Sequence, residues 1–458
     1  MDHLQNILSY FDQQQPLCAE HDRIPKDLYR EFGVKAGLRD ETGKGVLAGL
    51  TNISDIRAFQ YVDGVKHPAD GQLLYRGYDV KDLINGSRGS RFAFEEAGYL
   101  LLFGQLPTPE QLEQFCAVLG ECRTMPTNFT RDVIMKAPSH DIMNSMARSV
   151  LTLASYDPKA ADLDTSNVLR QSIQLAGIFP MLAVYSYHAY NHYEKDASMY
   201  IHRPDPSLST AENFLRMLRP DMQYTPLEAR VLDVALLLHA EHGGGNNSTF
   251  VCRALSSSGT DTYSAIAGAV GSLKGPLHGG ANAKVMQMFR DVKEHVDAKD
   301  DGSIRDYLVK LLAREVGDRS GKIYGLGHAV YTLSDPRAVL IKAYAGHLAE
   351  VKGFAEDFEL LEKVETIGAQ LLQEKRRSDD PICANVDMYS GLVYHMLGIP
   401  QEVFTPLFAT ARIAGWCANR IEEVLTGNRI MRPAYRAVTI HNHYVPMQER
   451  EAHMELPQ

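Results

Sequence analysis

PLEARVLDVALLLHAEHGGG, residues 226–245, is the stretch that decides the fold class of this 458-residue chain. After Pro226 its apolar residues recur at spacings of three and four, which is the pattern of a helix that buries one face. Three successive glycines then end the pattern, as glycine commonly does at the end of a helix. The sequence therefore predicts a helix that runs directly into a glycine loop.

The same helical spacing is present upstream, in residues 93–122. Two helical runs are separated there by Gly104 and Pro107. Thr108, with Gln111 three residues later, makes a capping box at the start of the second run. This segment predicts a helix, a turn and a second helix.

Helical signals continue along the chain, and strand signals are few. Ser209 and Glu212 form another capping box before the helical stretch that follows. Strand-like patterns are confined to short pieces, residues 72–79 and the region near 437–440, without a regular alternation of strands and helices. We therefore expect an all-α fold with at most minor β content.

The composition is that of an ordinary globular protein, with 45% hydrophobic and 23% charged residues. Its length allows a large core and two or three domains. The formal net charge of -10 gives no general attraction to nucleic acid or to an anionic membrane surface. An anionic substrate would have to be met by arginines and lysines placed locally.

Nothing in the sequence predicts export or a membrane span. The first residues carry early acidic side chains and lack the basic and apolar regions of a secretory signal. The most hydrophobic stretch, residues 175–185, is shorter than the roughly 20 apolar residues of a membrane helix. Six scattered cysteines lack the spacing of a zinc site or a redox dithiol. We expect a cytoplasmic protein with reduced thiols.

The first candidate site is the end of the helix quoted above. The predicted helix carries His239 and His242 one turn apart and then ends at Gly243. Two histidines on one helix face are compatible with a metal site, although no cysteine or third histidine nearby completes a ligand set. The alternative is a capped helix end, where glycines let a ligand approach and an imidazole donates to it.

A second candidate is His278, which follows Pro276 and precedes two glycines and a helix that begins near Ala281. The positive end of that helix disfavours an imidazolium and favours a neutral histidine that donates to a developing oxyanion. A structural histidine in a glycine turn is the alternative.

His328 repeats this arrangement, since Gly325 and Gly327 precede it and Arg337 follows nine residues later. Glycines of this kind can also wrap a nucleotide. Neither of the common phosphate-binding glycine patterns is present, however, so the segment does not predict a nucleoside triphosphate site.

Asp387 lies between an apolar stretch and a helical one, where an aspartate is either a reactive carboxylate or an ordinary helix cap, a role that Ser390 would serve equally. Downstream, Arg412 lies on a largely apolar helix, and Arg432 follows in a basic segment. An arginine among apolar neighbours requires an anion or an acid to satisfy it.

Four of these segments together resemble one enzyme family. GPLHGGANAKV (275–285), YGLGHAVYTLSDPR (324–337) and ANVDMYSG (384–391), in that order, resemble the three active-site signatures of citrate synthases. HAEHGGGNNS (239–248) resembles the oxaloacetate-binding histidine loop of that family. The likeness covers most of the chain, because residues 75–83, 94–107 and 411–416 also resemble citrate synthase segments. Only about the first 35 and the last 15 residues are left without a counterpart.

The resemblance implies a mainly α-helical homodimer with two domains. The large domain would comprise residues 1–277 and 391–458, and the small domain residues 278–390. The implied reaction is the condensation of acetyl-CoA with oxaloacetate through an enolate and citryl-CoA, followed by hydrolysis to citrate and CoA, with no metal or redox cofactor. A 2-methylcitrate synthase that uses propionyl-CoA is the nearest alternative, and a non-catalytic helical scaffold is an alternative of another class.

The resemblance also assigns roles to individual residues. His278 matches the histidine on the thioester carbonyl, Asp387 the base, and His328 the histidine on the oxaloacetate carbonyl. The residues matched to oxaloacetate binding are His242, Arg337, Arg412, the aromatic Phe408, and Arg432 from the partner subunit. The CoA contacts implied are the loop residues Lys322, Ile323, Gly325, Leu326 and Gly327, with Lys375, Arg376 and Arg377 either at the phosphates or in a solvated loop. Departures from the commonest family pattern are Asn419, Met388 and the run Tyr435, Arg436 and Ala437.

Overall fold

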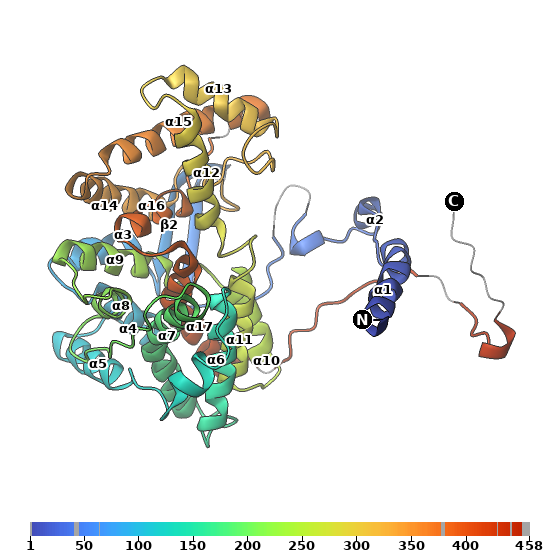
Figure 1. The fold of residues 1–458 in the computed structure, drawn as a ribbon, viewed down its shortest axis with the longest axis horizontal. Coiled ribbons are helices and arrows are strands. Elements are labelled where there is room, and N and C mark those ends of the chain that lie inside the picture. The colour runs from blue at the N-terminus through green and yellow to red at the C-terminus, as the bar shows by residue number, and fades with distance from the viewer. Residues whose placement is uncertain are drawn as a thin grey trace.

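The computed structural model describes residues 2–40, 45–63, 65–376, 381–427, 429–439 and 442–450. Within these ranges the chain forms seventeen α-helices and one small sheet (Figure 1), which confirms the predicted helical fold. The helices are α1 (Asp2–His21), α2 (Lys26–Glu31), α3 (Val80–Gly86), α4 (Ala93–Phe103), α5 (Pro109–Glu121), α6 (Ile142–Leu153), α7 (Thr165–Glu194), α8 (Thr210–Leu218), α9 (Pro226–His239), α10 (Asn247–Ser257), α11 (Thr262–Leu273), α12 (Ala281–His295), α13 (Asp301–Leu312), α14 (Pro336–Lys352), α15 (Ala355–Arg376), α16 (Asp387–Met396) and α17 (Phe404–Thr426). Short 3-10 or π turns are Ala36–Leu38, Thr130–Ile134, Ala154–Tyr156, Gln401–Val403 and Met447–Glu449.

The predicted capping boxes are present at the starts of α5 and α8, where both reciprocal hydrogen bonds are made. A third box, not predicted, starts α9, where Thr225 accepts from the backbone of Glu228. The helix α9 ends at His239, and Gly243 follows with a φ of 87°. The decisive stretch of sequence thus forms a helix and a glycine loop as predicted, but the helix ends at His239, so the prediction that His242 lies on the same helix is wrong and His242 lies in the loop.

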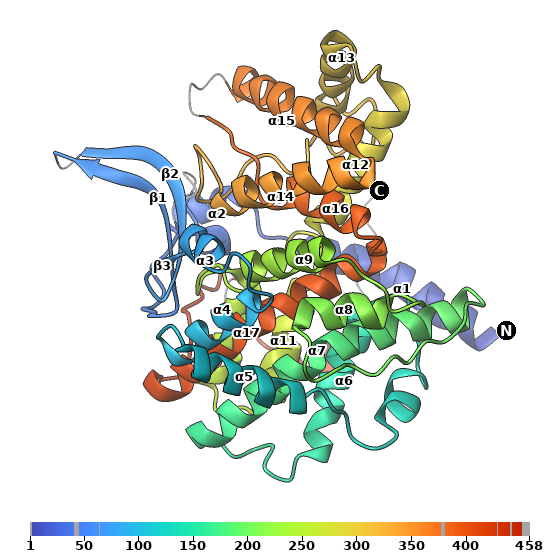
Figure 2. The same ribbon diagram turned by 90° about the vertical axis from the view of Figure 1, so that its left-hand side faces the viewer.

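The sheet consists of β1 (Ser54–Val62), β2 (Val65–Tyr75) and β3 (Tyr78–Asp79), all antiparallel. The β1–β2 ribbon runs from Ser54 opposite Tyr75 to Val62 opposite Val65 and projects from the side of the helices (Figure 2). The strand signal at 72–79 falls within β2 and β3. The strand expected near 437–440 is wrong over 437–439, which form no strand, and residue 440 lies outside the described residues.

The helix α17 is the centre of the core. It is buried along most of its length and packs against α4, α7, α9, α10 and α11. At Gly415 it approaches the end of α9 so closely that an added Cβ atom would lie 2.4 Å from the carbonyl oxygen of Ala240. Only glycine permits this contact. It holds α17 against the loop that carries His242.

The helices α12 to α16 form an upper layer (Figure 1). In this layer α12 and α14 pack on α16, α13 packs on α15, and α14 also contacts α9 and β2 below. The proposed domain boundaries at 278 and 390 are close to this layer but stay a prediction. In the described part of the chain no helix is long and apolar enough to cross a membrane.

The helices α1 and α2 lie near the described residues after 428, apart from the helical body (Figure 1). None of the buried core residues comes from α1, α2 or the described residues after 428. Instead α2 and the turn after it lie against residues 433–438, and the guanidinium of Arg436 stacks 4.5 Å above the ring of Phe32.

Candidate active site

The glycine-rich segments converge between α9, α17 and the upper layer. The rings of His242 and His328 are 5.2 Å apart, centroid to centroid. Nη2 of Arg337 lies 3.5 Å from Nε2 of His328. The charges of Arg337 and Arg412 both act on the pKa of Asp387. Residues that are far apart in sequence therefore share one buried site.

His242 is held in the loop after α9 and is buried. The hydroxyl of Tyr75 donates to the carbonyl of Leu237 over 2.9 Å and accepts from the backbone N–H of Glu241 over 3.2 Å, which fixes the end of the helix. Burial, followed by the positive charge of Arg337, lowers the pKa of His242 well below its usual value. The ring is therefore neutral, and its Nε2 atom has no hydrogen-bond partner in the described part of the chain.

His328 has a defined tautomer. The backbone N–H groups of Val330 and Tyr331 point at its Nδ1 atom over 3.0 and 3.1 Å, so Nδ1 accepts and the proton of the neutral ring is on Nε2. Burial, and then Arg337, lower the pKa of His328 to about 4. Nε2–H and the nearby Arg337 are both hydrogen-bond donors, so neither can accept a hydrogen bond from the other. Two donors side by side form a site for an anionic or carbonyl oxygen.

Arg337 is fixed by Asp335, which is also the N-cap of α14. Nε and Nη2 of Arg337 donate to the two carboxylate oxygens over 3.1 and 2.8 Å, and the Arg337 backbone N–H donates to Oδ1. Both side chains are buried. Burial disfavours the cation, but the charge and the hydrogen bonds of Asp335, together with the nearby Tyr331 and Asp387, raise the pKa of Arg337. Sequence reasoning assigned no role to Asp335, although its place directly before a proline at a helix start was a signal for a cap.

His278 is half-buried just before α12, which begins at Ala281 as predicted. Its Nε2 atom faces the backbone N–H of Ser248 at 3.3 Å and the Ser248 hydroxyl at 3.0 Å. Because the backbone N–H can only donate, Nε2 is the acceptor and the proton is on Nδ1. Burial, and then Arg412, lower the pKa of His278 to about 4, causes other than the helix end that the sequence suggested. Ser248 lies within the quoted histidine-loop motif, but its spatial partner is thirty residues away.

Asp387 is the first residue of α16 and is partly buried. Burial raises its pKa to about 6, against the opposing charge of Arg337. The helix-cap interpretation of this residue is wrong, because the side chain of Asn385 accepts the Asp387 backbone N–H over 3.0 Å. Ser390, the other cap considered, is inside the helix with its hydroxyl buried.

Arg412 lies fully buried in the middle of α17. Its Nε atom donates to the carbonyl of His239 over 2.6 Å, while Nη1 and Nη2 have no partner in the described part of the chain. Phe408, one turn earlier, has its ring 4.8 Å below the guanidinium and 4.3 Å from the ring of His239. Burial lowers the pKa of Arg412 to about 10, so it remains a cation. A buried cation with two unpaired nitrogens is a strong indication of an anionic ligand.

The loop from Lys322 to Gly327 lies beside the segment that leads to Asp387. The backbone N–H of Gly327 donates to the carbonyl of Cys383, and that of Asn385 donates to the carbonyl of Gly325, both over 2.8 Å. Ile323 is buried, and Leu326 packs against the core, so this loop offers mainly backbone.

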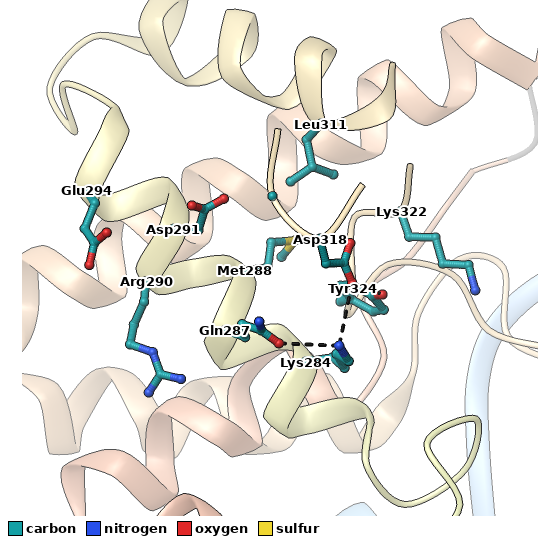
Figure 3. Close-up of a pocket in the computed structure, with 11 residues that line it drawn as sticks. Lys284, Gln287, Met288, Arg290, Asp291, Glu294, Leu311, Asp318, Lys322 and Tyr324 are labelled. Carbon is teal, nitrogen blue, oxygen red and sulfur yellow. Dashed lines mark hydrogen bonds and ion pairs between the residues drawn. The ribbon is translucent and has the colours of Figure 1, made fainter. Parts of the chain in front are cut away.

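A cavity of about 320 Å³ lies where this loop meets α12 (Figure 3). Lys322 and Tyr324 line it, together with Lys284 and Arg290 of α12. Asp318 is also in its wall, where it accepts from the Tyr324 hydroxyl over 2.6 Å. The cavity thus mixes cations and carboxylates.

The remaining candidates lie outside this cluster. Lys375 donates to the carbonyl of Leu312, Arg376 is exposed at the end of α15, and Arg377 lies outside the described residues. Arg432 is exposed where the chain leaves the body, and no hydrogen bond or ion pair of the described residues joins it to the other candidates. No group of three or more metal-ligating side chains is present among the residues described, and His239 and His242 do not form one.

Comparisons with known proteins all point to one family. The family "Citrate synthase, C-terminal domain" matches residues 38–434. The chain is 36% identical over 410 residues to a citrate synthase of Synechocystis, covering 89% of this chain and 92% of the relative. It is 34% identical over 363 residues to a 2-methylcitrate synthase of Shewanella oneidensis, covering 79% and 87%.

Solved structures match most of the chain. One is a ternary complex of carboxymethyl coenzyme A and oxaloacetate with citrate synthase from Thermoplasma acidophilum, with a TM-score of 0.74 and 27% identity, covering 91% of this chain and 99% of that one. Another is the citrate synthase of Thermotoga maritima, with a TM-score of 0.70 and 30% identity over 90% and 99% of the two chains. The chain belongs to the citrate synthase family.

Proposed function

We propose that this chain is a citrate synthase that condenses acetyl-CoA with oxaloacetate and hydrolyses the resulting citryl-CoA. The single observation that carries the proposal is Arg412, a fully buried cation whose Nη1 and Nη2 atoms are unpaired, facing a site shared with Arg337 and two neutral histidines. A dicarboxylate with a ketone between its charges matches this set of donors.

Oxaloacetate would lie between α17 and the upper layer. Arg412 and Arg337 bind its carboxylates, and Nε2 of His242 is a further donor. Asp335 holds Arg337 in place before the substrate arrives, so little ordering is required on binding. The ring of Phe408 packs beside the bound molecule.

Asp387 and His278 act on the acyl-CoA. A thioester methyl proton is weakly acidic, so a carboxylate removes it only when a donor stabilises the enolate at the same moment. The raised pKa of Asp387, about 6, leaves it ionised at neutral pH and makes it a stronger base than an ordinary aspartate. Nδ1–H of the neutral His278 donates to the thioester oxygen, where negative charge develops.

Carbon–carbon bond formation then involves His328. The enolate carbon attacks the ketone carbon of oxaloacetate, and Nε2–H of His328 donates to the oxygen that becomes the alkoxide. Water next adds to the citryl thioester, the thiol of CoA leaves, and citrate is released. Proton transfers and bond formation balance without an electron acceptor, so the proposal includes no redox cofactor, and every donor in it is a protein side chain.

CoA would lie along the loop that contains Lys322, Ile323, Gly325, Leu326 and Gly327. In this proposal the adenine edge meets the backbone of the loop, and Lys322 with the neighbouring cavity lies at the same loop. Lys375 and Arg376 are the proposed phosphate contacts, with Arg377 beyond the described residues.

The protein would act as a cytoplasmic homodimer in which Arg432 enters the partner's site. Arg432 is exposed at the point where the C-terminal segment leaves its own body. The ends of the chain also expose apolar side chains that this chain does not cover, among them Tyr10, Phe11 and Tyr435. A small domain of residues 278–390 would close over the substrates and exclude water from the enolate.

A 2-methylcitrate synthase is the second candidate, because a relative with that name matches almost as well as the citrate synthases. One methylene changes discrimination by only about 1 to 3 kcal/mol, so the shared residues do not separate the two. A non-catalytic scaffold is disfavoured, since burying an unpaired Arg412 costs stability that a scaffold would have no reason to lose.

CoA release with oxaloacetate tests the proposal when acetyl-CoA and propionyl-CoA are compared at equal concentrations. We expect a higher kcat/KM with acetyl-CoA, and a loss of turnover by orders of magnitude in Asp387→Asn. A preference for propionyl-CoA would establish the second candidate. Absence of CoA release with both substrates would contradict the enzyme proposal.

A further inference from the structure

We propose that strand β2 positions the two histidines that face oxaloacetate, with Gly71 and Tyr331 as positioning residues for His328 and Tyr75 as the positioning residue for His242. The inference rests on the proposed function, because it assigns a kinetic consequence to the placement of these rings.

The loop that carries His328 is attached to β2 by side-chain and backbone hydrogen bonds. The backbone N–H of Gly71 donates to the hydroxyl of Ser334 over 3.1 Å, and that hydroxyl donates to Asp70 over 2.9 Å. The hydroxyl of Tyr331 reaches the carbonyl of Gln72 at 3.4 Å. Consecutive residues of one strand thus hold two positions of the loop.

The approach at Gly71 leaves no room for a side chain. A Cβ atom there would lie 2.2 Å from the carbonyl oxygen of Ser334 and 2.6 Å from Cδ1 of Tyr331. Glycine is therefore required by close contact with the loop rather than by its backbone angles.

Tyr331 connects the strand to the site, because its ring lies against His328. It is 2% exposed, and its ring stacks on His328 with centroids 4.6 Å apart and planes at 29°. The same ring lies 5.8 Å from His242. Because Tyr331 is confined between the strand and the imidazole, the position of β2 determines the direction in which Nε2 of His328 points.

The C-terminal end of β2 holds the loop that carries His242. Tyr75, four residues after Gly71, fixes the end of α9 through Leu237 and Glu241. On the paired strand β1, Ile56 fills the space beside Gly243, where an added Cβ would lie 2.9 Å from its Cδ1 atom. Four residues of strand span about 13 Å. One rigid element therefore fixes the loop of each histidine, and with them the 5.2 Å separation of the rings.

The test compares Tyr331→Leu, which removes the stacked ring, with Tyr331→Phe, which keeps it. Gly71→Ala pushes the loop outward, and Gly86→Ala is its control, because a Cβ at Gly86 meets nothing within 4 Å. Turnover is measured by CoA release, oxaloacetate affinity by calorimetry and folding by the melting temperature. A displacement of about 1 Å costs on the order of 100-fold in rate, so we expect kcat to fall roughly 10- to 100-fold in Tyr331→Leu and Gly71→Ala. Tyr331→Phe should restore most of the activity, and Gly86→Ala should match the wild type.

His328→Ala in the same assays separates the two proposals. If His328→Ala is impaired while folded Tyr331→Leu keeps wild-type kcat and oxaloacetate affinity, the positioning role is overturned and the proposed function stands. If Tyr331→Phe loses as much kcat as Tyr331→Leu, stacking is not the cause and the inference also fails. If wild-type protein releases no CoA, it is the proposed function that fails.

Discussion

The backbone N–H of Ser248 lies 3.3 Å from Nε2 of His278, and the indole Nε1–H of Trp416 donates to the hydroxyl of the same serine over 3.2 Å. The serine therefore sets the tautomer of the histidine through its backbone and holds the ring through its side chain. The proton of the neutral ring is therefore on Nδ1, the atom proposed to donate to the thioester oxygen.

His278→Ala should lower turnover at least roughly 100-fold, as the loss of an oxyanion donor does, while oxaloacetate still binds. Ser248→Ala should lower it far less, because the backbone N–H that fixes the tautomer remains. CoA release and calorimetry with oxaloacetate check both variants. Equal losses in the two variants would contradict this division of roles.

The pH dependence of kcat/KM should report Asp387. A base must be ionised to act, and burial raises the pKa of this carboxyl to about 6. Activity should therefore be constant above this value and fall tenfold per pH unit as the pH decreases below it. Initial rates between pH 5 and 8 measure the profile. An acidic limb near pH 4, the usual range of an aspartate, would contradict the assignment.

Asp387→Asn should stabilise the folded protein while abolishing turnover. A carboxyl whose pKa is raised by folding binds its proton more tightly in the folded state, so at pH 7.5 its ionisation destabilises that state by up to about 3 kcal/mol. The gain in melting temperature should shrink as the pH falls from 7.5 to 5, because the wild-type carboxyl becomes protonated in the folded protein. If the gain in melting temperature is independent of pH, the negative charge of Asp387 is not its cause.

Arg412→Met should have opposite effects on stability and on binding. Replacing an unpaired buried cation by an apolar side chain of similar length should raise the free energy of unfolding by about 1 to 4 kcal/mol. Oxaloacetate should raise the melting temperature of the wild type and leave that of the variant unchanged. If the variant is still stabilised by oxaloacetate, Arg412 does not bind a carboxylate.

Arg432 acting across the dimer predicts complementation between two inactive variants. Co-expression of Arg432→Ala and His328→Ala at equal levels should restore about a quarter of wild-type activity, since half of the dimers are mixed and each has one intact site. Either variant alone should be nearly inactive. Absence of complementation in confirmed mixed dimers would place Arg432 in its own subunit's site.

The sequence predicted the helical class and the segments that meet at the site, because helix periodicity and glycine punctuation are local properties. Residues 54–71 were not recognised as strands, since this ribbon is exposed at many positions on both faces and lacks a clear apolar alternation. The sequence offered Asp387 or Ser390 as a helix cap, and gave no sign that the side chain of Asn385 accepts the backbone N–H of Asp387. Ser248 and Asp335 acquire their roles only from the distances that folding creates.

The backbone contact at Gly415 has a consequence for product release. The helix α17 and the end of α9 meet there without an intervening side chain, so Arg412 and His242 belong to one rigid unit. His328, Arg337 and Asp387 are supplied by the layer above, whose helix α14 contacts α9 and β2. Citrate would therefore leave when these two groups of binding residues separate. Arg412 and His242 would keep their positions relative to each other for the next oxaloacetate.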